Sequence, residues 1–383
     1  MTPFFETVFT DVTQNAPLAL ISLPGAEELA EKIDRYLIQW YSEASNSKLS
    51  KTSFIIPTHY PRFSSGDGKA MIDDTVRGKD LYIIIDVGNH GVTYDMFGQQ
   101  QRMSPDDHFA NLKRVISAAG GKPSRLTVIM PMLYGGRQHR RNSRESLDCA
   151  QMLQELEFMG VKDIITFDAH DPRVQNAVPL MGFDNYFPTY QVLKAINKRY
   201  PDVQLDKNHF MVVSPDEGAM PRNIFYASVL GLDLGMFYKR RDYSTVVNGR
   251  NPIVAHEYIG NSVMGMDVFV ADDIIATGDS CLRLARELKD KGAQRIFLTA
   301  TFAMFTEGVE KFNEAYKEGL FDAVIATNLT YRKPELKQAE WFVEADLSKY
   351  VAYIISACNH NESVSRLLDP HTKVRELLNK INK

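Results

Sequence analysis

The stretch VADDIIATGDS, residues 270–280, joins a buried strand pattern to two acids and then to a Thr-Gly-Asp-Ser turn. A helical pattern follows and ends before Gly292. Backbone amides at the start of such a helix, together with the hydroxyls of Thr277 and Ser280, can surround a phosphate monoester. The stretch therefore predicts a strand, a phosphate-binding turn and a helix, in that order along the chain.

The two acids of this stretch have a separate chemical use. Asp272 and Asp273 precede the turn and can bind the hydroxyls of a sugar, either directly or through Mg²⁺. Their negative charge is tolerable beside a phosphate when the acids contact the sugar and the amides contact the phosphate. The sequence therefore indicates a site for a phosphorylated sugar.

Outside this stretch, apolar runs alternate with helical patterns. The runs have the composition of buried parallel strands and lie at residues 81–87, 126–133, 163–170, 210–216, 267–273 and 295–301. Helical spacing occurs between them, for example from Leu147 to Gly160. This alternation predicts an α/β fold.

Polar side chains end three of these runs. They are Asp168 with His170, the segment 214–216, and Asp272 with Asp273. Ligands of open parallel sheets bind outside the carboxyl ends of the strands. Such residues also form turns and cap the helices that follow, and for any one of them the two interpretations are equally well supported. Three sets together favour a site.

Length and composition limit the class of protein. The chain has 383 residues, of which 44% are hydrophobic and 24% are charged, and this excludes a small module and a disordered chain. At about 150 residues per domain, two domains are expected. The net charge of −4 at pH 7 provides no overall positive field, so we expect no nucleic-acid partner.

Cysteine content and the N-terminus bear on location. Cys149, Cys281 and Cys358 form no CxxC pair and no zinc-type cluster, as is typical of a reducing compartment. Glu6 stands where a signal peptide needs basic residues, and the apolar stretch 16–24 is too short to span a bilayer. We expect a cytoplasmic protein with no membrane partner.

The domain boundary is expected within residues 187–208, where a helical segment becomes polar between two series of strands and helices. We predict an N-terminal domain at 1–190, a C-terminal domain at 191–350 and a helical tail at 351–383. The basic, amphipathic end of the tail is typical of a packed or fraying terminal helix.

The 270–280 stretch resembles the phosphoribosyl diphosphate binding signature of the type I phosphoribosyltransferase superfamily. That signature has two acids and, three residues later, Thr-Gly-x-Ser/Thr. The Rossmann and P-loop alternatives fail because no GxGxxG or GxxxxGK[ST] follows a strand. One position departs from the pattern, because Ala276 stands where the superfamily often has a third acid.

Most of the chain resembles the ribose-phosphate diphosphokinase family, the phosphoribosyl diphosphate synthetases. The matching pieces follow the family's order: DTVRGKDLYII (74–84), GGRQHRRNSRES (135–146), TFDAHDPRVQ (166–175), VVSPDEGAMPR (212–222), FYKRRDYS (237–244) and the 270–280 stretch. Additional residues near 89–108 and 307–336 distinguish the chain from shorter members. The resemblance implies two type I phosphoribosyltransferase domains, each a mainly parallel sheet flanked by helices.

The resemblance assigns the N-terminal domain to ATP. Arg137 and Gln138 match a pair that contacts ATP, and Phe63 matches a Phe that stacks on adenine across a subunit interface. An aromatic face and an Arg-Gln pair suit a purine and its phosphates. Asp168 and His170 match an Asp-x-His motif in which the His helps to hold the Mg²⁺ of ATP. Without the other motifs, we would interpret the arginine as solvated surface and the histidine as structural.

The resemblance assigns the C-terminal domain to ribose 5-phosphate and the diphosphate. Ser214, Asp216 and Gly218 lie in SPDEGA, which is similar to an SPDxGG loop that faces the diphosphate, with Ala219 in place of the second Gly. Ribose 5-phosphate is assigned to Asp272, Asp273, Thr277, Gly278, Asp279 and Ser280.

Lys239 and Arg241, in FYKRRDYS, match a Lys and an Arg that close over the reacting phosphates, and we expect them to be the catalytic residues. Positive charge suits this chemistry, because the protein contributes mainly positioning and stabilisation of developing charge. Alone, a basic cluster beside a polar loop would be interpreted as surface.

The resemblance implies a Mg²⁺-dependent transfer of diphosphate from ATP to the 1-hydroxyl of ribose 5-phosphate, which gives phosphoribosyl diphosphate and AMP for nucleotide biosynthesis. It also implies a homo-oligomer built from dimers, with a hexamer as the larger assembly. Three other interpretations stay open. One is a nucleobase phosphoribosyltransferase, which leaves the RQ and DAH segments unexplained. Another is a non-catalytic regulatory relative, which Ala276 and Ala219 motivate. The third is the same chemistry on another ribose 5-phosphoester.

Overall fold

The computed structural model describes residues 15–44, 52–241 and 253–381, with side chains except at 239–241, 253–256 and 381. Contacts divide the chain into two compact units. Unit 1 consists of Met1–Phe187, Asn328–Tyr331 and Asp346–Leu368, and unit 2 consists of Pro188–Thr327, Arg332–Ala345 and Asp369–Lys383. One crossing between the units therefore falls at Phe187, inside the segment where a boundary is expected. The limits of 190 and 350 themselves stay a prediction.

Unit 1 contains a parallel sheet in the order β1-β4-β7-β8-β9. Its strands are β1 (Leu18–Ser22), β4 (Asp80–Ile84), β7 (Arg125–Ile129), β8 (Asp163–Phe167) and β9 (Gly182–Tyr186). Its helices are α1 (Glu27–Ala44), α2 (Pro105–Ala119), α3 (Asp148–Phe158), the 3₁₀ helix η1 (Pro172–Ala177), α9 (Ser348–Asn359) and α10 (Ser365–Leu368). Two short antiparallel pairs lie outside this sheet: β2 (Thr58–His59) with β3 (Met71–Ile72), and β5 (Thr93–Met96) with β6 (Gln99–Arg102).

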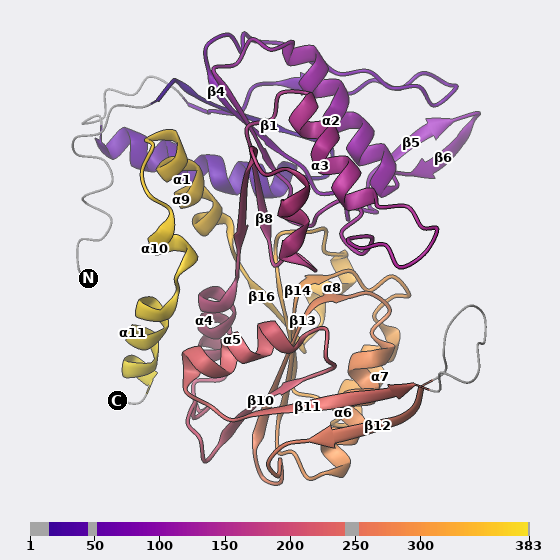
Figure 1. Ribbon diagram of the computed structural model, residues 1–383, viewed down its shortest axis with the longest axis vertical. Coiled ribbons are helices and arrows are strands. Elements are labelled where there is room, and N and C mark those ends of the chain that lie inside the picture. The colour runs from indigo at the N-terminus through magenta and orange to yellow at the C-terminus, as the bar shows by residue number, and fades with distance from the viewer. Residues whose placement is uncertain (1–14, 45–51, 242–252, 382–383) are drawn as a thin grey trace. The chain divides into compact units, whose positions relative to one another are not determined.

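Helices cover both faces of this sheet, with α1 and α9 on one side and α2 and α3 on the other (Figure 1). Alternate strand residues such as Ile83 and Val128 pack in one buried cluster with Leu112 of α2 and Leu153 of α3. On the opposite face, Phe167 of β8 lies against Tyr350 of α9, with ring centroids 6.2 Å apart. The sheet of unit 1 is therefore buried on both sides, as its continuous apolar runs predict.

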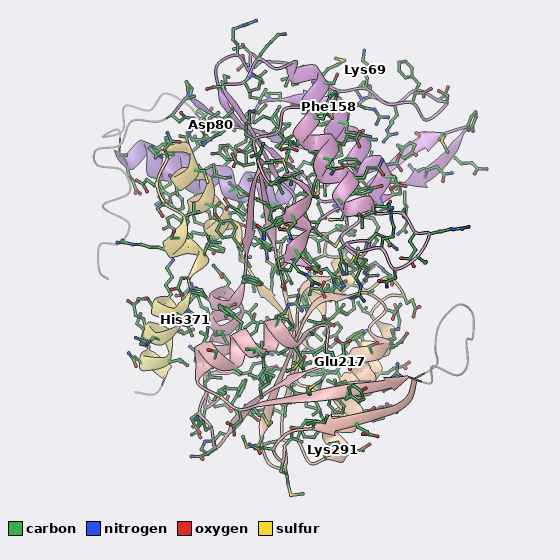
Figure 2. The ribbon with its side chains drawn as sticks, viewed as in Figure 1. Lys69, Asp80, Phe158, Glu217, Lys291 and His371 are labelled. Atoms are coloured by element: carbon green, nitrogen blue, oxygen red, sulfur yellow. The ribbon has the colours of Figure 1, made fainter. Side chains whose placement is uncertain are left out.

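A buried ion pair connects segments of unit 1 that lie far apart in the sequence. Asp80 is fully buried and accepts hydrogen bonds from Arg125 at 2.8 and 2.6 Å. Asn359, at the end of α9, donates to Asp80 at 2.9 Å and to the carbonyl of Ala16 at 3.0 Å. Figure 2 labels Asp80 at the start of β4. The segment that carries α9 is thus part of the core of unit 1.

Unit 2 contains a larger sheet in the order β12-β11-β10-β13-β14-β15-β16, parallel except for the antiparallel pair β11-β12. Its strands are β10 (Phe210–Ser214), β11 (Leu234–Arg241), β12 (Ile253–Ile259), β13 (Asp267–Ile275), β14 (Ile296–Ala303), β15 (Ala323–Thr327) and β16 (Phe342–Ala345). Its helices are α4 (Thr189–Arg199), α5 (Met220–Leu230), α6 (Asp279–Asp290), α7 (Glu310–Lys317), α8 (Pro334–Gln338) and α11 (His371–Ile381).

The strand order of unit 2 reverses between β10 and β13. From β10 the chain proceeds outward to β11 and β12, and from β13 it proceeds in the other direction to β14, β15 and β16. In open α/β sheets, ligands bind at such a reversal, outside the carboxyl ends of the strands. The turn at residues 276–280 follows β13 directly, so the fold places it at this point.

The structure confirms the α/β class and the mainly parallel sheets flanked by helices, and it refines several strands. The run at 267–273 continues to Ile275, because Ile274 and Ile275 pair with Phe302 and Ala303 of β14. The tail ends in α11, which packs on α4 and α5, with the rings of His371 and Phe225 5.7 Å apart. Within the described ranges, no helix has the length and apolar character needed to cross a membrane.

Candidate active site

A cavity of about 200 Å³ opens at the strand reversal of unit 2. Its walls come from the ends of β10 and β13, the start of α6 and the facing part of β14. It is lined by Pro215, Asp216, Val270, Asp272, Ile274, Ile275, Ala276, Thr277, Gly278, Ser280, Cys281, Arg283, Leu298 and Thr299. The structure thus brings the predicted phosphate turn, one predicted sugar-binding acid and the predicted diphosphate loop to one cavity.

Gly278 fixes the shape of the phosphate turn. It precedes α6 with φ of 89°, in the left-handed region that favours glycine. A Cβ atom there would lie 2.3 Å from the ring of Phe312 on α7. The turn therefore requires glycine both for its backbone conformation and for the close approach of α7.

The polar side chains of the turn bond to one another. Thr277 donates its hydroxyl to Asp279 Oδ2 at 3.0 Å, and the Asp279 N–H points back to Thr277 Oγ1 at 3.4 Å. Asp279 and Ser280 are both exposed. Asp279 does not line the cavity, whereas Ser280 does. The Asp279 side chain is directed instead to Lys311 of α7, whose Nζ lies 2.6 Å from Oδ1.

The two predicted sugar-binding acids lie in different surroundings. Asp272 lines the cavity, with 41% of its side chain exposed, whereas Asp273 is only 5% exposed and does not line it. Successive residues of a strand point to opposite faces of the sheet, and both acids lie within β13. Asp272 is therefore the acid that reaches the cavity, whereas Asp273 belongs to the surroundings that shape the charge of Asp272.

The pKa of Asp272 is raised. The largest cause is the loss of water around the carboxyl group on burial. The second is repulsion from the neighbouring carboxylate of Asp273. Asp216 also raises this pKa, whereas Arg222, whose Nη1 lies 3.7 Å from Asp272 Oδ1, lowers it. A cation placed among these acids would relieve their mutual repulsion.

The loop after β10 both lines the cavity and begins the next helix. Ser214 donates its hydroxyl to the carbonyl of Asp216 at 2.8 Å, and Asp216 Oδ1 accepts the N–H of Ala219 at 3.1 Å. A Cβ added to Gly218 would lie 3.3 Å from Asp216 Oδ1. Ala219 has ordinary helical dihedrals, φ −85° and ψ −4°, and is buried. This loop therefore accommodates Ala219, and the side chains of Ser214 and Asp216 also hold the turn that leads into α5.

Asn223 is a positioning residue at the start of the acidic segment of β13. Its buried amide accepts the N–H of Ala271 at 3.1 Å and donates to the carbonyl of Ala271 at 2.8 Å. The pairing of β10 with β13 ends at Val213 and Val270, so this amide continues the hydrogen-bond ladder by one residue, immediately before Asp272. An Asn within an amphipathic helix gives no sequence signal of such a role.

Lys239 and Arg241, predicted as the catalytic residues, lie at the end of β11, and their side chains are outside the described part of the structure. The backbone of β11 continues beyond Met236, which pairs with Ser214 at the end of β10. Lys239 pairs with His256 and Arg241 pairs with Ile253 of β12, across an irregularity in the ladder. The polar loop that follows them lies outside the described residues.

In unit 1, Asp168 and His170 follow the end of β8. Asp168 is 3% exposed, has φ of 48°, and donates its N–H to the carbonyl of Tyr186 at 2.8 Å. His170 is exposed, and its ring lies beside that of His139, with centroids 5.2 Å apart. His139 Nε2 in turn lies 3.5 Å from Asp171 Oδ2. The structure thus adds His139 and Asp171 to the predicted pair.

The charges of these added residues are set by their neighbours. Hydrogen bonding from Arg173 lowers the pKa of Asp171 to about 2, so this carboxylate is ionised at neutral pH. Burial lowers the pKa of His139, and this effect outweighs the nearby carboxylate of Asp171, which raises the pKa. His139 follows Arg137 and Gln138, which are both exposed, so the segment reaches from a solvent-accessible surface to the end of β8.

Phe63 lies in a different part of unit 1. It is 58% exposed and lines a second cavity, of about 570 Å³. The other lining residues are His59, Tyr60, Pro61, Arg62, Lys69 and Met71, and Figure 2 labels Lys69 at this end of the unit. An exposed aromatic ring beside basic side chains suits a planar, anionic ligand such as a nucleotide.

The side chains present determine whether the protein can bind a metal ion. Within the described residues, no group of three or more His, Cys, Asp or Glu side chains could hold a metal ion. Mg²⁺ commonly needs only one or two carboxylates, because water and substrate phosphates complete its shell. Asp216 and Asp272 both line the unit 2 cavity, so the donor set there fits Mg²⁺ that binds together with a phosphorylated substrate.

The fold defines the class of this protein. It superposes on a crystal structure of phosphoribosylpyrophosphate synthetase from Mycobacterium smegmatis with a TM-score of 0.71, at 19% sequence identity, over 90% of this chain and 99% of that chain. Residues 184–320 match the family model of the phosphoribosyl transferase domain. The protein therefore has the fold of the phosphoribosyltransferase-type α/β proteins.

Sequence comparison identifies the family within that class. Residues 18–160 match the model of the N-terminal domain of ribose phosphate pyrophosphokinase. Ribose-phosphate pyrophosphokinases of Vibrio parahaemolyticus and Pasteurella multocida are each 29% identical, over 80% of this chain and 90% and 89% of the relative. The chain belongs to the ribose-phosphate pyrophosphokinase family, which confirms the resemblance found in the sequence.

Proposed function

We propose that the protein transfers the intact diphosphoryl group of ATP to the 1-hydroxyl of ribose 5-phosphate, giving 5-phosphoribosyl 1-diphosphate and AMP. The observation that carries this proposal is the unit 2 cavity, which combines a phosphate turn with Asp272 and Asp216. The chain also matches an N-terminal domain model described for ribose phosphate pyrophosphokinase. That match favours the synthetase over a nucleobase phosphoribosyltransferase.

The unit 2 cavity supports the binding of ribose 5-phosphate. The backbone amides of residues 277–280, at the start of α6, hold the 5-phosphate, with the hydroxyl of Ser280 beside them. Asp272 binds the ribose hydroxyls, and Asp273 sets the charge of Asp272. The loop at 214–218, which contributes Asp216 to the same cavity, faces the diphosphate.

Unit 1 supplies the nucleotide contacts in this proposal. Phe63 stacks across a subunit interface on the adenine of the ATP bound by a neighbouring copy, while Arg137 and Gln138 contact ATP within the same chain. His170 and Asp168 are the proposed metal-binding residues of the ATP side. His139 lies beside His170 and limits the orientations of its ring.

We infer that Mg²⁺ accompanies each substrate. In unit 2, Asp216 and Asp272 would hold the ion that comes with ribose 5-phosphate, and in unit 1, Asp168 and His170 would hold the ion that comes with ATP. When bound, Mg²⁺ neutralises and orients the diphosphate. The other chemical steps belong to substrates and side chains. The oxygen of the 1-hydroxyl forms a bond to the β-phosphorus, the bond from that phosphorus to the oxygen shared with the α-phosphorus breaks, and the hydroxyl proton passes to solvent.

Lys239 and Arg241 stabilise the charge that develops on the departing AMP. Their place at the end of β11, adjacent to the strand that carries the 214–218 loop, supports this role. Ala276 lines the cavity where a third acid is common in the superfamily, so this chain uses no carboxylate base at that position. The anomeric hydroxyl is relatively acidic, and charge stabilisation suffices for its attack.

The test is acceptor-dependent formation of AMP, measured by chromatography after incubation with ATP, Mg²⁺ and ribose 5-phosphate. Parallel reactions replace ribose 5-phosphate with another ribose 5-phosphoester, or supply phosphoribosyl diphosphate and a nucleobase. AMP formation with ribose 5-phosphate supports the proposal. Activity only in one of the replacement reactions would overturn it, and so would ATP binding without any turnover, as expected of a regulatory relative.

Two further properties belong to this proposal. A homo-oligomer built from dimers is expected, and light scattering of the purified protein measures its mass directly. A cytoplasmic location is also proposed, because the three cysteines are unpaired in the structure, as is typical of a reducing compartment.

A further inference from the structure

The segment that leads into α7 makes several contacts with the phosphate turn. The N–H of Met304 donates to the carbonyl of Ile275 at 2.8 Å, and the N–H of Thr306 donates to the carbonyl of Ala276 at 3.0 Å. The ring of Phe312 occupies the space beside Gly278. The turn is therefore held by α7 and the residues before it, as well as by β13 and α6.

A charged contact also joins α7 to the phosphate turn. Lys311 Nζ lies 2.6 Å from Asp279 Oδ1 and 2.9 Å from Glu307 Oε2. The lysine side chain is 26% exposed, whereas the two carboxylates are 61% and 59% exposed. Lys311 is therefore the partly enclosed centre of a small charge cluster at the edge of the turn.

Asp279 brings an unfavourable charge to a site for an anion. Hydrogen bonds from Lys311 and Thr277 lower its pKa, so its carboxylate is ionised at neutral pH. An ionised carboxylate within the turn repels a phosphate dianion that binds to the neighbouring amides. The contact with Lys311, which Glu307 shares, partly offsets the charge of this carboxylate and holds it away from the cavity, which Asp279 does not line.

We propose that Lys311 is a positioning residue that sets the affinity of the phosphate turn for a phosphate monoester, by compensating Asp279 and holding its side chain outside the cavity. This inference rests on the proposed function of the same turn. It assigns Asp279 a backbone contact with the phosphate and gives its side chain a structural partner. It also gives α7, in the 307–336 segment that distinguishes the sequence from shorter relatives, a role in substrate affinity.

The test is a charge-rescue series: Lys311→Gln, Asp279→Asn and the double variant. Lys317→Gln is the matched control, because Lys317 is an exposed lysine at the other end of the same helix. Calorimetry measures the dissociation constant of ribose 5-phosphate, and steady-state kinetics measures KM and kcat for both substrates. Thermal melting shows that each variant is folded.

We expect Lys311→Gln to raise the dissociation constant and the KM of ribose 5-phosphate about tenfold, as one uncompensated charge near a dianion does, while the KM of ATP and kcat change little. The double variant returns to within about threefold of the wild type, because the repelling carboxylate is gone. Lys317→Gln has no effect. A purely structural role of Lys311 would not be rescued by removal of Asp279.

The inference is overturned if Lys311→Gln binds ribose 5-phosphate as the wild type does, or if the double variant is no better than Lys311→Gln. Failure of the proposed function gives a different pattern: the wild type binds ribose 5-phosphate without forming AMP, and the binding series still decides the role of Lys311. A wild type that binds neither ribose 5-phosphate nor inorganic phosphate at millimolar concentration overturns both.

Discussion

Replacement of Asn223 by Leu tests how the fold positions the sugar-binding acid. The amide of Asn223 is the hydrogen-bond partner of both backbone groups of Ala271, at 3.1 and 2.8 Å, where the pairing of β10 and β13 has ended. Leucine has the same branching and number of heavy atoms as asparagine and cannot make either bond. Ala271 is fully buried, so water does not replace the lost partner.

The magnitude follows from these two bonds. A buried backbone group left without a partner costs about 1–3 kcal/mol, so the loss of both predicts a decrease of about 2–6 kcal/mol in the free energy of unfolding of unit 2. We expect about 3 kcal/mol, because the apolar leucine side chain recovers part of the loss through burial. The KM of ribose 5-phosphate should also rise, since Ala271 directly precedes Asp272.

The two tryptophans allow a clean assay, because Trp40 lies in unit 1 and Trp341 lies in the core of unit 2. Urea unfolding, followed by Trp341 fluorescence in a Trp40→Phe background, reports on unit 2. Asn208→Leu is the control, because Asn208 is exposed. A loss below about 1 kcal/mol for Asn223→Leu, equal to that of the control, would refute the argument that this amide completes the ladder.

Three other predictions follow from the structure. Arg125→Met leaves the buried carboxylate of Asp80 without its cationic partner, and urea unfolding monitored by circular dichroism should show a loss of about 3–5 kcal/mol. Gly278→Ala places a methyl group against Phe312 at a φ of 89°, so the strain predicts a loss of about 2 kcal/mol and a higher KM for ribose 5-phosphate, measured by AMP formation. The raised pKa of Asp272 means that the folded protein binds more protons than the unfolded chain above about pH 4. Its contribution to stability therefore falls as the pH rises through this window, and urea unfolding from pH 5 to pH 8 should show a weaker pH dependence for Asp272→Asn. A stability unchanged in Arg125→Met, a wild-type KM in Gly278→Ala, or identical pH profiles for Asp272→Asn would each contradict the corresponding argument.

Much of the fold could be predicted because its parallel strands are buried on both faces. Such strands are continuous apolar runs, and those at 81–87, 163–170 and 210–216 overlap with β4, β8 and β10. The strand β1 was recognised only as an apolar stretch too short to span a membrane. The sequence gives no comparable signal for β12, because an edge strand lacks a continuous apolar run.

The candidate site was predictable where backbone geometry and residue type coincide, as in the turn at 277–280. The surroundings of Asp272 and Asp273 differ because β13 extends to Ile275 and places both acids within the strand. The apolar residues Ile274 and Ile275 alone do not show in the sequence that the strand continues. The roles of Asn223 and Lys311 depend on contacts with Ala271 and Asp279, which are 48 and 32 residues away in sequence. A single sequence carries no information about such pairs.

The central claim, diphosphoryl transfer at the unit 2 cavity, is tested most directly by phosphorus NMR of the protein incubated with ATP, Mg²⁺ and ribose 5-phosphate. A reaction without acceptor and the Lys239→Ala variant are the controls. The account predicts signals of 5-phosphoribosyl 1-diphosphate and AMP that require the acceptor and are lost in Lys239→Ala. ADP in place of AMP, or no acceptor-dependent signal from a folded protein that binds ATP, would contradict it.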